Sequence, residues 1–112
     1  KVYNISGDRA VSFDGLARAC AAAVGKSADA LELIHYHPKQ FDFGKRKAFP
    51  MRLQHFFTSI EKAKAELNWR PEFDLVGGLK DSFLHDYLAS GRNQAEVDFS
   101  TDDQILQAAM IR

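Results

Sequence analysis

Residues 2–36 read VYNISGDRAVSFDGLARACAAAVGKSADALELIHY, and this stretch decides which fold the sequence predicts. The short apolar runs 2–5 and 31–36 have the composition of strands, and turn-forming residues follow each of them. Between them, apolar side chains recur at helical spacing over residues 12–24. A strand, a helix and a second strand in that order form the βαβ unit of a parallel sheet. We therefore predict an α/β fold whose remaining strands lie upstream.

The expected helix over residues 12–24 has recognisable ends. Ser12 is a residue type that caps helix N-termini through its hydroxyl, and Gly25 is the type that ends helices in a left-handed conformation. Cys20 falls on the apolar side of this helix, so we predict a buried thiol that behaves as a small hydrophobic group. It is the single cysteine of the chain, which excludes an internal disulfide and favours a reducing compartment.

Three further helical patterns follow in the second half of the chain. Each begins at a residue that can cap an N-terminus, and the first of them combines Thr58 with Glu61 as a capping box. The expected helices run from Thr58 to Leu67 with Asn68 as the stop, from Asp74 to about Ser90 with Gly91 as the stop, and onwards from Ser100 or Thr101 with Ile105 and Ala109 on the apolar side.

The composition is that of one globular domain. The 112 residues are 46% hydrophobic and 27% charged, which excludes a disordered or collagen-like chain. No apolar run approaches the roughly 18 residues of a membrane span, so we expect no membrane partner. The net charge is zero, yet residues 35–70 carry eight basic and three acidic side chains, and residues 71–112 carry three basic and eight acidic ones. The middle segment can therefore attract phosphate locally.

The segment 38–57 has no regular period and is rich in both cations and phenylalanines. Guanidinium and ammonium groups bind phosphate, and aromatic faces stack on unpaired bases. Exposing five phenylalanines together would create a large apolar patch, so we expect several of them in the core. A purely structural reading, with the cations merely solvated, stays open. The candidate RNA- or phosphate-binding residues are Lys39, Lys45, Arg46, Lys47 and Arg52.

The pattern His35-x-His37 is the one that most resembles a metal site. On a strand the two imidazoles would share a face, with His55 or Asp42 as a third ligand. Spacing alone is weak evidence of ligation, so we expect hydrogen-bonding histidines and no metal. The sequence has neither a glycine-rich dinucleotide cradle nor a P-loop, so we expect no cofactor within this segment. No pattern identifies a catalytic residue.

Two parts of the sequence resemble known families. One resemblance is to the C-terminal part of extended short-chain dehydrogenases/reductases of the NAD-dependent epimerase/dehydratase type. It is carried by residues 2–7, VYNISG, with the helix start 12–17, SFDGLA, and by residues 52–55, RLQH, with 59–73, SIEKAKAELNWRPEF, and Gly77-Gly78-Leu79. Residues 35–57, HYHPKQFDFGKRKAFPMRLQHFF, and residues 98–106, DFSTDDQIL, are similar to the chloroplast stem-loop-binding proteins and their cyanobacterial relatives, a branch of that superfamily.

The resemblance implies that residues 1–112 are the C-terminal part of a single larger Rossmann-like protein. The dinucleotide-binding half would lie upstream, so any NAD(P) site would belong to the full-length protein and not to this segment. It implies RNA binding at stem-loops, a role in RNA processing and stability, and endoribonuclease activity. It also implies association with ribosomes or a plastid transcription complex, and an oligomer with itself or a paralogue. The implied location is the chloroplast stroma, or the cytoplasm of a cyanobacterium.

Two alternatives to RNA binding remain open. In an NAD-dependent sugar-nucleotide epimerase, dehydratase or reductase, Arg52 would hold a diphosphate. His55 stands three residues later, where such enzymes commonly carry an aspartate, and this difference argues against a nucleotide-sugar substrate. In a purely structural role, the acidic residues 96–103 would contact a partner.

Overall fold

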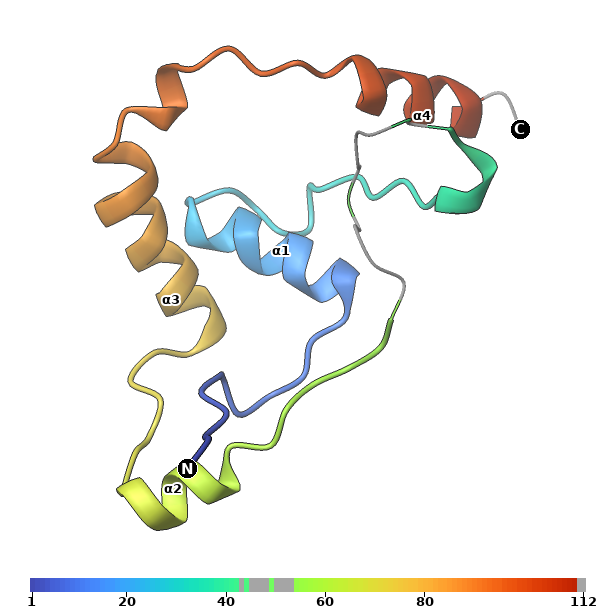
Figure 1. Ribbon diagram of the computed structural model, residues 1–112. Helices are drawn as coiled ribbons and strands as arrows, with labels where there is room; N and C mark the ends of the chain where they lie inside the picture. The colour runs from blue at the N-terminus through green and yellow to red at the C-terminus, as the bar shows by residue number, and fades with distance from the viewer. Residues whose placement is uncertain (43, 45–48, 50–53, 111–112) are drawn as a thin grey trace. The chain divides into compact units, whose positions relative to one another are not determined.

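The computed structural model describes residues 1–42, 44, 49 and 54–110 (Figure 1). The chain divides into two compact units. Unit 1 consists of Lys1–Leu31 and His55–Asn93, and unit 2 consists of Glu32–Gln54 and Gln94–Arg112. Each unit therefore joins two stretches that are far apart in the sequence.

The predicted α/β fold is wrong. Residues 2–5 and 31–36 are not strands, and within the described residues the chain forms helices and loops with no sheet (Figure 1). A strand is stable only when a neighbouring strand pairs with its backbone N–H and C=O groups. Residues 2–5 belong to unit 1 and residues 32–36 to unit 2. The carbonyl of Val2 instead accepts a hydrogen bond from Lys62 Nζ at 2.9 Å. This piece is therefore not a Rossmann-like fragment.

Helix α1 (Phe13–Ala23) begins and ends where the sequence predicts. The Ser12 Oγ accepts a hydrogen bond from the Gly15 N–H at 3.0 Å, which satisfies one of the free donors of the first turn. At the other end Gly25 has φ +80°. Its N–H donates to the Ala22 carbonyl, and the Lys26 N–H donates to the Ala21 carbonyl. This pair of bonds is the Schellman arrangement that glycine permits.

Helix α2 (Glu61–Leu67) forms without the predicted capping box. The Thr58 hydroxyl instead lies 2.9 Å from the hydroxyl of Ser6. The Ser59 Oγ accepts the Glu61 N–H at 3.3 Å, so a local serine turn precedes the helix. The predicted stop is confirmed, because Asn68 adopts the left-handed conformation with φ +53°.

Helix α3 (Leu75–Ser82) packs against α1 within unit 1 (Figure 1). Asp74 caps it as predicted, because its Oδ1 accepts the Gly77 N–H at 2.7 Å. The helix continues as a π-helical segment, η2 (Phe83–Leu88), in which the rings of Phe83 and Tyr87 stack with centroids 5.6 Å apart. Gly91, at φ +71°, ends the run as predicted.

Unit 2 contains a single-turn 3₁₀ helix, η1 (Pro38–Gln40), and helix α4 (Ser100–Met110). The short turn η3 (Arg92–Gln94) lies where the two units join in sequence. At the start of α4, Asp98 Oδ1 accepts the Ser100 N–H at 2.9 Å. The last helix is therefore confirmed, but the residue that supports its first turn is Asp98.

The buried residues are few and mostly small. Among the described residues, those that pack as core are Ala21, Ala23, Ile60, Ala63 and, in unit 2, Ile105. Cys20 is exposed, so the prediction of a buried thiol is wrong. Successive helical residues are rotated by about 100°, and α1 turns Ala21 inward in place of Cys20. No helix in the described part of the chain is both long and apolar enough to span a membrane.

Candidate nucleic-acid interface

One of the predicted phosphate-binding cations lies in the described part of the chain. Lys39 is in η1 and its side chain is exposed. Lys45, Arg46, Lys47 and Arg52 lie outside the described residues. The structure therefore gives the position of Lys39 and the local geometry of the chain that flanks the basic run.

His37 has a structural role at the start of η1. Its Nδ1 accepts the Lys39 N–H at 3.2 Å, and its carbonyl accepts the Gln40 N–H at 2.9 Å. The hydrogen-bonding interpretation of His37 is thus confirmed. In residues 1–42, 44, 49 and 54–110, no group of three or more His, Cys, Asp or Glu side chains is placed to hold a metal ion.

A tight turn stands directly before the basic run. Asp42 Oδ1 accepts the Gly44 N–H at 2.9 Å, and Gly44 has φ +59°. An aspartate that bonds the backbone two residues ahead forms an Asx turn, and the positive φ suits glycine. This local turn therefore precedes the basic run in the sequence.

Tyr36 connects the two sides of this loop. Its hydroxyl donates to the Phe49 carbonyl at 2.5 Å, and its ring meets the Phe41 ring edge-to-face at a centroid distance of 5.5 Å. Edge-to-face contact is a favoured geometry for aromatic pairs. Sequence reasoning placed Tyr36 in a strand and missed this role, because the two bonded residues are thirteen positions apart.

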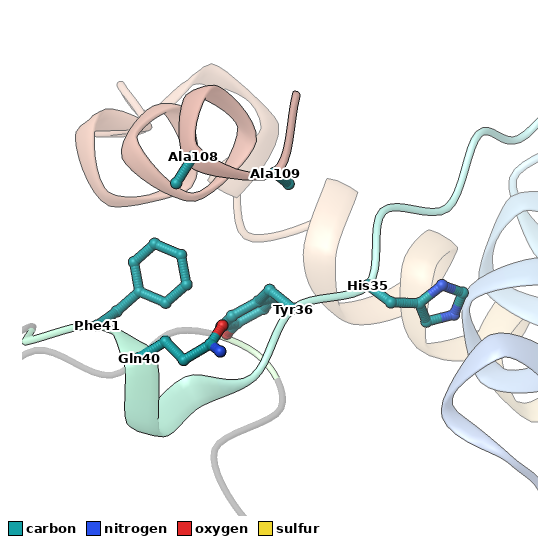
Figure 2. Close-up of a pocket in the computed structure, with 6 residues that line it drawn as sticks. All are labelled: His35, Tyr36, Gln40, Phe41, Ala108 and Ala109. Carbon is teal, nitrogen blue, oxygen red and sulfur yellow. The ribbon is translucent and has the colours of Figure 1, made fainter. Parts of the chain in front are cut away.

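A small cavity lies between this aromatic pair and α4. It has a volume of about 190 Å³ and is lined by His35, Tyr36, Gln40, Phe41, Ala108 and Ala109. Figure 2 shows the Phe41 ring between the η1 turn and Ala108, with the His35 ring directed away from it. Ligand pockets are usually about 300–1,000 Å³, and a cavity of about 150 Å³ accommodates a benzene ring. This cavity can therefore take one ring but not a nucleotide.

The environment keeps Tyr36 in its neutral form. Burial raises the pKa of its phenol above the ordinary 10.0, and the negative charge of Asp102 in α4 raises that pKa further. The neutral hydroxyl is the form that can donate to the Phe49 carbonyl. The raised pKa therefore extends the pH range over which this hydroxyl can donate.

Unit 1 has a larger and more open groove, which is electrostatically balanced. It has a volume of about 1,030 Å³, and among its lining residues are three cations and three acids. They are Arg9, Lys64, Arg70, Asp8, Glu72 and Asp74. Lys64 is already paired with Glu61 at 3.0 Å. A groove of zero net charge has no general attraction for a polyanion, so the basic segment is the better candidate for contact with nucleic acid.

The comparisons with known proteins give one match. The chain is 55% identical over 111 residues to the chloroplast stem-loop binding protein of 41 kDa b of Arabidopsis thaliana. The alignment covers 99% of this chain and 29% of the relative, in the C-terminal part of that protein. The predicted resemblance to the stem-loop-binding proteins is thus confirmed. No family model matches the chain, and no solved structure matches it.

Proposed function

We propose, from the match to a chloroplast stem-loop binding protein, that this chain is a part of such a protein that contacts RNA. The observation that carries the proposal is the 55% identity over 99% of the chain, which includes the basic segment. Since the chain spans 29% of the relative's length, the proposal concerns this region and leaves other RNA contacts to the remainder of the protein. The name of the relative also supports a chloroplast location.

In the proposed mode of binding, the cations of residues 39–52 hold phosphate groups. Lys39 supports this role because its ammonium group is exposed, and the Asx turn at Asp42 and Gly44 supports it because a local turn precedes the basic run in the sequence. Contacts to phosphate give affinity and position without reading sequence. In this mode the shape of the RNA, and not its base sequence, would determine where on the RNA the protein binds.

The test is the salt dependence of RNA binding by the complete protein. We expect the substitution of Lys45, Arg46 and Lys47 by alanine to weaken binding to a stem-loop RNA at low salt. It should also reduce the slope of log affinity against log salt by about 2 to 3, because each phosphate contact contributes about 0.7–0.9 to that slope. Equal affinity and slope in the variant and the wild type would contradict the proposal.

A matched control removes the same charge from elsewhere in the chain. Arg18, Lys26 and Lys80 are exposed and lie outside the basic segment, and replacing them by alanine also removes three positive charges. If this control loses as much affinity and slope as the variant in residues 45–47, general charge and not the basic segment explains the attraction.

The same proposal includes assembly with ribosomes or a plastid transcription complex. RNA could link the protein to either assembly, so co-sedimentation of the complete protein is compared before and after ribonuclease treatment. Loss of co-sedimentation after treatment supports RNA tethering. Retention identifies a direct protein contact, for which the acidic residues 96–103 are the first candidates to replace.

A further inference from the structure

We propose that Phe56 and Phe57 form a stacking platform for unpaired bases in the loop of a stem-loop RNA. The inference rests on the proposed function and adds to it a means of distinguishing single-stranded from double-stranded RNA. Neither residue belongs to the set of cations that we expect at the phosphates. The chemical class recognised is the face of an unpaired nucleobase.

The first observation is the exposure of the two rings. The exposed fraction is 69% for Phe56 and 81% for Phe57, which makes Phe57 the most exposed aromatic residue in the described part of the chain. Phe56 and Phe57 are therefore not among the phenylalanines of this segment that could lie in the core. Each of these exposed rings offers an apolar face that is suited to contact with another molecule.

The second observation is that the residues directly after the rings are held in place within unit 1. The Thr58 hydroxyl is bonded to that of Ser6 at 2.9 Å, Ser59 forms the turn into α2, and Ile60 is only 3% exposed. The rings thus project from an anchored piece of backbone. A surface that is already ordered loses less conformational entropy when it binds.

The third observation is chemical and concerns the neighbouring sequence. Arg52 precedes Phe56 by four residues in the sequence. His55, which is also exposed, stands between them and is itself a residue that stacks on bases. Cations followed by exposed aromatic residues are the combination by which proteins bind single-stranded nucleic acid. This combination favours a nucleobase over an apolar protein surface as the occupant.

The platform predicts a difference between two RNAs with the same stem. A hairpin offers unpaired bases in its loop, whereas a blunt duplex offers none, because paired bases are stacked within the helix. We expect replacement of Phe56 and Phe57 by leucine to weaken hairpin binding about tenfold or more and to leave duplex binding unchanged. Leucine keeps the apolar surface but removes the aromatic face.

The experiment uses the complete protein and a hairpin RNA with 2-aminopurine in its loop. Stacking on a ring should quench the fluorescence of this base with the wild type and not with the Phe56→Leu, Phe57→Leu variant. Phe99→Leu is the matched control, because Phe99 is also exposed, at 60%, and lies in unit 2. Phe57→Trp should restore both affinity and quenching in the presence of Phe56→Leu, which keeps the test valid if the leucine variant folds poorly.

The possible outcomes separate this inference from the proposed function. If the wild type binds neither RNA, the proposed function fails and the platform fails with it. If the wild type binds the hairpin, and the leucine variant binds and quenches equally well, the platform alone is overturned. Equal losses on hairpin and duplex would also overturn it, since they would show that the rings pack against protein and support the structure as a whole.

Discussion

The hydroxyl of Tyr36 donates a hydrogen bond to the carbonyl of Phe49 at 2.5 Å. These two residues enclose, in sequence, the part of the chain that carries Lys39, Lys45, Arg46 and Lys47. Closing a loop lowers the entropy of the residues within it. We therefore expect this bond to connect the stability of unit 2 to RNA binding by the cations that lie between its ends in the sequence.

Replacement of Tyr36 by phenylalanine tests this connection. The change removes the hydroxyl and keeps the ring that contacts Phe41, so the expected loss of local stability is about 1 kcal/mol, typical of one hydrogen bond. Backbone amides in residues 37–49 should exchange with deuterium faster. Affinity for a stem-loop RNA should fall by less than tenfold, because the charges remain and only their ordering is weakened.

Tyr87→Phe is the control for this substitution. Tyr87 stacks on Phe83 in η2, in unit 1, so loss of its hydroxyl leaves the loop in unit 2 unchanged. If the two variants exchange alike in residues 37–49, the Tyr36 hydroxyl does not order the loop. Unchanged RNA affinity together with faster exchange would show that the loop's order has no influence on binding.

The titration of Tyr36 gives a second prediction, at alkaline pH. Its pKa is raised in the folded state, first by burial and second by Asp102, so folding favours the protonated phenol. The stability that this contributes is fully present below pH 10.0, the ordinary pKa, and is lost as the pH rises through the folded-state pKa. We expect unit 2 to lose stability above pH 10, where the phenolate forms and can no longer donate to Phe49.

Ultraviolet absorbance of tyrosinate during alkaline titration measures this directly. The wild type should show a tyrosine that ionises above pH 10, and Tyr36→Phe should lack that step. Asp102→Asn should lower the pKa of Tyr36 only partly, because burial is the larger cause. Tyr3 also has a raised pKa, through its hydrogen bond to Glu66, so the titration is repeated in a Tyr3→Phe background.

The helix ends could be predicted from sequence because they depend on contacts a few residues apart. Ser12 bonds the backbone three residues ahead, as does Asp74, and Gly25 needs only its own left-handed φ. Thr58 shows the limit of such reasoning. It has the right spacing from Glu61 for a capping box, but its hydroxyl is bonded to Ser6, fifty-two positions away.

The prediction of strands at residues 2–5 and 31–36 was wrong for the same reason, because strands also depend on distant contacts. An apolar run specifies a strand only if another strand pairs with it, and that pairing is not local. The residues of the candidate interface also fall into a group that sequence predicted and a group that it did not. Residue type predicted the cations, whereas the bond between Tyr36 and Phe49 and the exposure of Phe57 depend on tertiary structure and have no periodic signal in the sequence.

The exposure of Cys20 gives a third prediction. Helical spacing places this residue on the apolar side of α1, but the structure exposes it and buries Ala21 and Ala23. A maleimide should therefore modify Cys20 in the native protein at a rate close to that in denaturant, because the reagent does not have to wait for unfolding. Mass spectrometry before and after addition of the reagent measures the extent of modification.

Cys20→Ser is the control that assigns the added mass to this thiol. Modification that requires denaturant would contradict the exposed position, and it would show that another part of the complete protein covers this side of α1. The neighbouring side chains make that outcome informative, since Phe13 and Val24 at the two ends of α1 are 43% and 39% exposed. A covered Cys20 would then identify the α1 surface as a contact face, whereas rapid modification would show that α1 is open to solvent in the native protein.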